Sequence, residues 1–143
     1  MIDGSLIELW LVDAYPDVAA ALRVAFADCE GVSVACDDIL ALAENTIVSP
    51  ANGQGFMDGA LDASCAACFG PALQTEVRRR IAMRPDGMLP VGASLRVATG
   101  HGRIPLRIVA PTMPGPGTVD PKNAFFAMAA VLNVASQHGA ARS

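Results

Sequence analysis

The sequence predicts an α/β fold with a mixed, mainly parallel sheet. Apolar, β-branched runs alternate with segments in which apolar residues recur at helical spacing, and residues 5–36 predict a strand, a helix and a second strand. Such a unit is nearly always right-handed, with parallel strands. Residues 94–99 and 106–110 flank a Gly100-His101-Gly102 turn and predict a hairpin, which adds an antiparallel pair. At 143 residues the chain can bury a core without disulfides or metals, so we expect a single domain over residues 1–143.

The composition limits the classes of partner. Hydrophobic residues make up 52% of the chain, but no apolar run approaches the roughly 20 residues of a membrane span. The net charge of −4 argues against a nucleic-acid backbone as the main partner. The segment Met1-Ile2-Asp3-Gly4 lacks the basic and hydrophobic regions of a signal peptide, so we expect a cytoplasmic protein with no membrane association.

The first strand–helix–strand unit has clear boundaries. Residues 5–12 are nearly all apolar, as in a strand covered on both faces. Pro16 fits the first turn of a helix over 16–29, and Gly31 follows its end. Its expected core face consists of Val18, Leu22, Ala25 and Cys29. Residues 32–36 then form the second strand.

The stretch from 46 to 62 combines a strand, a glycine-rich loop and a helix start. Residues 46–48 predict a buried strand that Pro50 ends, and Asn52, Gly53 and Gly55 form a loop able to adopt positive φ. A helix is expected from Asp58 to Phe69. The loop N–H groups and the helix dipole would create an anion-binding cradle, although a plain tight turn explains the glycines equally well. The spacing of a P-loop, a dinucleotide fingerprint or a nucleophile elbow is absent.

The second half alternates in the same way. Gly70-Pro71 breaks the helical pattern, and a further helix is expected over about 72–84. Residues 111–118 are too rich in proline for regular structure. Asp120-Pro121 caps a last helix that ends before Gly139. Its expected core face consists of Phe125, Met128, Leu132 and Ala135.

Two residue clusters have a structural and a functional interpretation. Cys65 and Cys68 have a metal-type spacing, but no second matching pair exists and no redox context surrounds them, so we interpret them as small core residues and expect no metal site. Arg78-Arg79-Arg80 is interpreted as a solvated helix face opposite Leu73, Val77 and Ile81.

The amino-acid sequences of several segments resemble those of the macro domain family, over roughly residues 32–135. Ile47-Val48-Ser49-Pro50-Ala51-Asn52, followed by Gly55-Phe56-Met57-Asp58-Gly59-Ala60-Leu61, is similar to the family's Val-Asn-Ala-Ala-Asn strand, glycine run and Val-Asp-Gly-Ala-Ile segment. Asp38-Ile39 resembles its Gly-Asp-Ile-Thr step, and 89–92 and 108–112 resemble two later strands. The resemblance implies a three-layer α/β/α macro-like fold that binds ADP-ribose or an ADP-ribosylated substrate without a cofactor.

The resemblance also assigns roles to individual residues. Asp38 would accept a hydrogen bond from the adenine amino group, and the Ile39 N–H would approach the ring. Backbone N–H groups around Gly53, Gly55 and Phe56 would hold the diphosphate or distal ribose, with Met57 packing nearby. In hydrolytic members, residues matching Asn52 and Asp58 orient the distal ribose and a water, and a carboxylate there stabilises developing positive charge. From the residues alone, Asp38 and Asp58 also fit helix N-caps.

The chain departs from the family pattern in ways that bear on activity. Its glycine run is reduced to Gly-Gln-Gly-Phe, Asp62 stands where many members have histidine, and the family's last strand, second glycine loop and final helix have no counterpart. The resemblance therefore implies a fold incomplete at the C-terminus. It favours ADP-ribose binding and leaves hydrolysis open. The alternative is a non-enzymatic, oligomerising scaffold derived from a macro domain, with a homo-oligomer formed through the exposed sheet edge.

Overall fold

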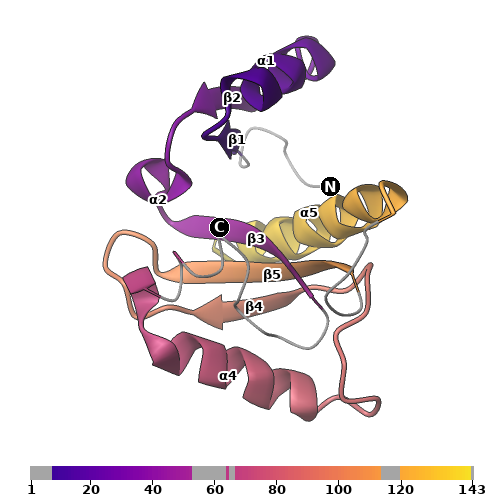
Figure 1. Cartoon of the computed structure of the whole chain (residues 1–143). Coiled ribbons are helices and arrows are strands. Elements are labelled where there is room, and N and C mark those ends of the chain that lie inside the picture. The colour runs from indigo at the N-terminus through magenta and orange to yellow at the C-terminus, as the bar shows by residue number, and fades with distance from the viewer. Residues whose placement is uncertain (1–7, 53–63, 65–66, 114–119, 143) are drawn as a thin grey trace. The chain divides into compact units, whose positions relative to one another are not determined.

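A computed structural model describes residues 8–52, 64, 67–113 and 120–142, with side chains for all but 49–52 and 136–142. In chain order the elements are β1 (Leu9–Asp13), α1 (Pro16–Ala25), β2 (Val32–Cys36), α2 (Ile39–Leu42), β3 (Thr46–Asn52), α4 (Pro71–Ala82), β4 (Leu95–Ala98), β5 (Leu106–Met113) and α5 (Lys122–Arg142) (Figure 1). Contacts divide the chain into a first unit, Met1–Ala43 with Ala135–Ser143, and a second unit, Glu44–Val134. The expectation of one domain stays a prediction.

The first unit contains the expected parallel strand–helix–strand arrangement. β1 pairs with β2 from Leu9 opposite Val32 to Asp13 opposite Cys36, and α1 connects them. Pro16 occupies the first turn of α1, as predicted. The expected core face of this helix is wrong. It ends at Ala25, its buried residue is Ala19, and Val18 and Cys29 are exposed. Burial of an alanine lets a helix lie closer to its strands than a row of larger side chains would.

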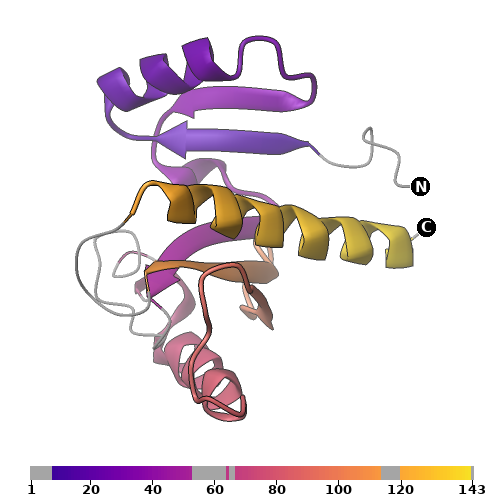
Figure 2. The ribbon, with the colours of Figure 1, turned by 90° about the vertical axis from the view of Figure 1, so that its right-hand side faces the viewer.

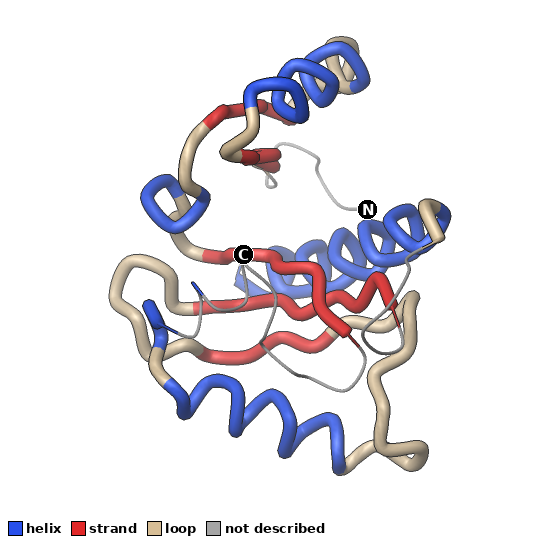
Figure 3. The backbone as a smooth tube through the Cα atoms, viewed as in Figure 1, coloured by secondary structure: helices blue, strands red, loops and turns tan. Residues whose placement is uncertain are grey.

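The second unit is built on a mixed sheet in the order β3-β5-β4 (Figure 3). β3 runs parallel to the central strand β5, with Thr46 opposite Leu106, and β4 runs antiparallel to β5, with Leu95 opposite Val109. The predicted hairpin and the mixed sheet are therefore confirmed.

Two prolines lie inside strands, which corrects two expectations. β3 continues through Pro50 to Asn52, and β5 includes Pro111. Proline is tolerated in a sheet where its missing N–H is not required by the ladder. The hydrogen bond from the Leu106 N–H to the Asn45 carbonyl fixes which residues of β3 turn their backbone N–H and C=O toward β5. The backbone groups of position 50 turn away from β5. Position 111 faces the side where β4 has not yet begun, because β4 starts opposite Val109.

Helices cover both faces of this sheet, α4 on one side and the start of α5 on the other (Figure 2). Ile108 and Ala110 of β5 form a buried cluster with Ala127 and Val131 of α5. Residues of the opposite parity face α4, which buries Leu73, Val77 and Ile81 as the sequence predicted. Gly70 begins α4 at φ 84°, a backbone conformation that favours glycine.

The predicted core face of α5 is wrong in part, because Met128 and Ala135 are half-buried but its two larger members are exposed. Phe125 is 72% exposed and Leu132 is 38% exposed, whereas Ala127, Ala130 and Val131 are buried. The helix also continues through Gly139 to Arg142. An apolar helix offers several possible faces, and the alanine face allows the closest approach to β5.

Arg107 is the one buried charged residue among the described part of the chain, at 1% exposure on the central strand. It lies opposite Ile47 of β3 and Val97 of β4, on the face covered by α4. Arg107 takes part in at least one interaction. A charge so deeply buried is tolerated only when it is compensated, so this position constrains the packing around β5.

The β4–β5 connection is organised by one histidine. His101 Nδ1 accepts hydrogen bonds from the N–H groups of Arg103 and Ile104, both at 3.2 Å. Its ring packs edge-on against Phe69, with centroids 5.7 Å apart. Thr99 adds a hydroxyl bond to the Ile104 carbonyl and accepts the His101 N–H at 3.0 Å. A single imidazole thus joins the turn to the helical residues before α4.

Substitution of His101 separates its two contacts. We expect His101→Phe to keep the ring contact but lower the free energy of unfolding by about 1–2 kcal/mol, because two backbone N–H groups lose their acceptor. His101→Asn supplies a carbonyl oxygen for those N–H groups and should destabilise less. Urea unfolding of both variants measures the difference, and equal losses would assign the stabilisation to the ring instead.

Candidate functional site

The parallel strands β3 and β5 bring their carboxyl ends to the same edge of the second unit's sheet. Asn52, the last residue of β3, pairs with Met113, and the register shifts between Ala51 and Asn52. Carboxyl ends of parallel strands are where open α/β sheets bind ligands, and ladder irregularities concentrate beside such sites. The backbone of Asn52 is therefore at a position suited to ligand contact.

The start of α5 is fastened to this edge. Asp120 Oδ1 accepts the Lys122 N–H at 2.9 Å, which confirms the predicted cap. Asn123 Nδ2 donates to the Thr112 carbonyl at 2.8 Å and so ties the first turn of α5 to the end of β5. Sequence reasoning missed Asn123, because its partner is not a neighbour in the local pattern.

Asp38 lies in the first unit, two residues after the end of β2, and caps α2. Its Oδ1 accepts the Leu40 N–H at 3.0 Å, and its own N–H donates to Asp37 Oδ1 at 2.7 Å. The Asp37 N–H in turn donates to the Asp13 carbonyl at 3.1 Å, which anchors the segment to β1. The N-cap interpretation made from the sequence is confirmed.

The cap uses only one of the two carboxylate oxygens of Asp38. The side chain is exposed, and within the described ranges no hydrogen bond reaches its Oδ2. The following residue, Ile39, is half-buried, and its N–H likewise has no acceptor among the described residues. The Asp38-Ile39 step therefore has one carboxylate oxygen that can accept and one backbone N–H that can donate, in consecutive residues.

The remaining predicted site residues, Gly53, Gly55, Phe56, Met57 and Asp58, lie outside the described residues, as does the side chain of Asn52. Their binding and catalytic roles stay predictions. The structure gives the local geometry of Asp38 and Ile39 and, separately, the backbone of Asn52.

The expectation that Cys65 and Cys68 form no metal or redox site stays a prediction, because the structure describes only one of the two residues. Cys68 is exposed, contrary to the expectation of a core residue, and Cys65 lies outside the described residues. No cluster of three or more potential metal ligands occurs in the described part of the chain. Nor is any helix there long and apolar enough to cross a membrane.

The arginines at positions 78–80 of α4 do not all lie on the solvated face expected opposite Leu73, Val77 and Ile81. Arg79 forms an ion pair with Glu76 at 2.7 Å, and its hydrogen bond lowers the pKa of Glu76. Arg80 instead donates to the Arg96 carbonyl in a partly buried contact. The solvated-face interpretation thus holds for Arg79 and needs correction for Arg80.

Comparisons with known proteins place the fold. No protein-family model matches the chain, and no curated protein matches its sequence. Among solved structures, the chain is similar to the macrodomain of Mycobacterium tuberculosis DarG, with a TM-score of 0.58 and 17% sequence identity. The match covers 68% of this chain and 63% of that one, so this chain spans somewhat less than two thirds of its length. The predicted macro-like α/β fold is confirmed at the level of architecture.

The cap at Asp38 can be tested through stability. We expect Asp38→Ala to lower the free energy of unfolding by about 1 kcal/mol, because the Leu40 N–H loses its acceptor. Asp38→Ser keeps a capping oxygen and should retain most of the stability. Chemical denaturation compares the two, and an equal loss in both variants would contradict the capping role.

Proposed function

We propose that this chain binds ADP-ribose or an ADP-ribosyl group. The observation that carries the proposal is the macro-like fold together with the Asp38-Ile39 step after β2 and the Asn52 position at the end of β3. These positions match the family's ligand-binding segments by sequence.

Asp38 would recognise adenine. Its capped conformation holds the carboxylate in one orientation, and Oδ2 can accept a hydrogen bond from the exocyclic amino group while Oδ1 stays on Leu40. The Ile39 N–H would donate to a ring nitrogen. A side chain that is already fixed loses less conformational entropy when it binds.

The glycine-rich loop would hold the rest of the ligand. Backbone N–H groups around Gly53, Gly55 and Phe56 suit a diphosphate or ribose, because phosphates bind well to clusters of backbone donors. Met57 would pack against the ligand. Hydrolysis of an ADP-ribosyl linkage is the further possibility, with Asn52 orienting the distal ribose and Asp58 a water at the anomeric carbon.

Calorimetric titration with ADP-ribose, with AMP as the smaller control ligand, tests binding. We expect saturable binding to the unsubstituted chain. Asp38→Ser should weaken the affinity about tenfold, because a hydroxyl preserves the cap but cannot reach the adenine amino group as a carboxylate does. Asp28→Ser, at an exposed aspartate of the same unit that makes no contact with the Asp38 cap, is the matched control and should bind normally.

The hypoxanthine analogue of ADP-ribose makes the titration specific for the amino group. A carbonyl replaces the amino group, so the unsubstituted chain should bind this analogue poorly, and Asp38→Asn should partly restore binding through its amide N–H. The absence of heat with millimolar ADP-ribose would contradict the proposed function and favour the non-enzymatic scaffold. Binding that ignores Asp38 would retain the function but reject the adenine contact.

Substitution of Asp58 tests whether this residue acts in binding or in hydrolysis. If Asp58 positions the attacking water, Asp58→Ala should abolish release of ADP-ribose from an ADP-ribosylated protein while leaving ADP-ribose affinity within about twofold. Asp62→Ala is the control for a nearby carboxylate. Loss of folding in Asp58→Ala alone, seen by circular dichroism, would assign Asp58 to helix capping instead.

A further inference from the structure

Strand β4 is an outer strand of the second unit's sheet, where β5 is its one partner among the described strands. The Thr99 N–H donates to the Pro105 carbonyl at 3.0 Å, which sets the alternation of this antiparallel ladder. Val97 therefore turns its N–H and C=O toward β5, and Arg96 and Ala98 turn theirs outward. The outer edge of β4 carries backbone groups in the arrangement that an added strand would pair with.

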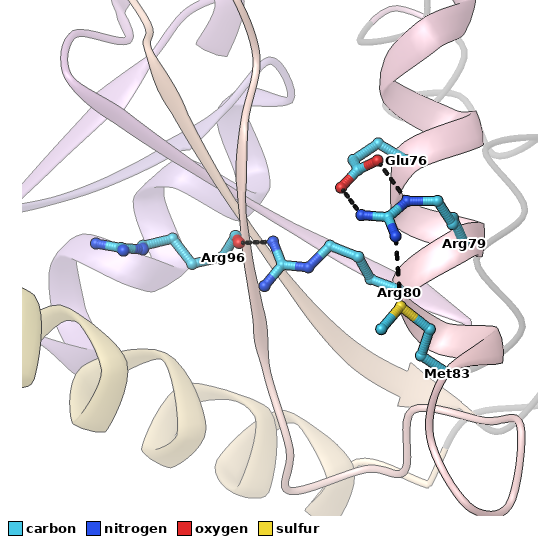
Figure 4. Close-up of polar contacts among 5 residues, drawn as sticks. All are labelled: Glu76, Arg79, Arg80, Met83 and Arg96. Carbon is cyan, nitrogen blue, oxygen red and sulfur yellow. Dashed lines mark hydrogen bonds and ion pairs between the residues drawn. The ribbon is translucent and has the colours of Figure 1, made fainter.

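Arg80 of α4 reaches this edge. Its Nη1 donates to the Arg96 carbonyl at 2.5 Å in a partly buried contact, and Figure 4 shows the guanidinium pointing at that oxygen while the Arg96 side chain extends away from it. A charge-assisted hydrogen bond is stronger than the neutral bond that an added strand would offer. The acceptor at the middle of the β4 edge is thus already occupied.

We propose that Arg80 prevents the β4 edge from pairing with the β4 edge of a second copy of this chain. An antiparallel pair is symmetric, so the same edge in two copies is complementary about a two-fold axis. Pairing would require each copy to release its Arg96 carbonyl from Arg80 and would place two guanidinium groups against the joint. Both requirements oppose association.

The other outer strand, β3, has a comparable feature that does not involve Arg80. Thr46, Val48 and Pro50 are the positions that face away from β5, as the Leu106 to Asn45 bond establishes. Pro50 has no N–H, so that edge lacks one donor in its second half. Each outer strand therefore withholds one ladder group, by a bonded acceptor on β4 and by an absent donor on β3.

The neighbouring Arg79 provides a matched control. Its guanidinium bonds Glu76 at 2.7 and 2.9 Å and contacts Met83 Sδ at 3.4 Å, all within α4 and the residue after it (Figure 4). None of these partners lies on β4. Substitution of Arg79 removes the same charge from the same helix without opening the edge.

The experiment compares Arg80→Met with Arg79→Met in the full chain, by sedimentation velocity over a concentration series. Methionine keeps an unbranched stem but cannot donate to the Arg96 carbonyl. We expect self-association to strengthen about tenfold or more in Arg80→Met, because each copy regains one ladder acceptor, and to stay unchanged in Arg79→Met. Ala98→Pro, added to Arg80→Met, removes an outward N–H and should reverse the association.

Several results would overturn the proposal. Pairing through β4 is rejected if Arg80→Met associates no more than the unsubstituted chain, if Arg79→Met associates as strongly as Arg80→Met, or if Ala98→Pro leaves the association intact. If Arg80→Met does not fold, Arg80→Leu repeats the comparison. Failure of both to fold while Arg79→Met folds would show that Arg80 is required for folding and would reject edge closure as its role.

Discussion

The pairing of β3 with β5 is the constraint on which the second unit depends. These strands are distant in sequence, and their parallel register places Ile47 opposite Arg107 and Val48 opposite Ile108. With that register set, one parity of β5 faces α4 and the other faces α5. A slip of one residue would exchange the faces and bring the Arg107 guanidinium against the alanine-rich side of α5. The buried charge therefore makes the register costly to change.

The same register explains why local proline rules failed. A proline ends a strand when the ladder needs its N–H, and which side needs that N–H is decided by the neighbouring strands. Pro50 faces away from β5, and Pro111 lies beyond the start of β4. Neither circumstance is visible in the residues around the proline. Strand existence was predictable from β-branched runs, whereas strand length depended on partners far away in the sequence.

The core face was predictable from the sequence for α4 but not for α5. On α4, apolar residues occur at one helical spacing among charged ones, so Leu73, Val77 and Ile81 were predictable as core. From position 124 to 135 of α5 every residue but Asn133 is apolar, so periodicity selects no single face there. The large side chain of Phe125 suggests a core residue. However, Ala127 and Val131 pack against the sheet instead, because small residues permit closer packing. Composition predicted close helix packing without identifying the face that achieves it.

At the candidate site, too, contacts between residues close in sequence were predictable and those between distant residues were not. Asp38 was predictable as a cap, because a capping carboxylate and the N–H it accepts are two residues apart. Its proposed ligand role depends on groups that no local pattern identifies. The two roles are physically compatible: the cap occupies Oδ1 and restricts the side-chain rotation, so Oδ2 is held in an orientation fixed before any ligand arrives. A carboxylate that was free to rotate would lose more entropy on binding, so the local stabilising contact is also what would make Asp38 an efficient acceptor.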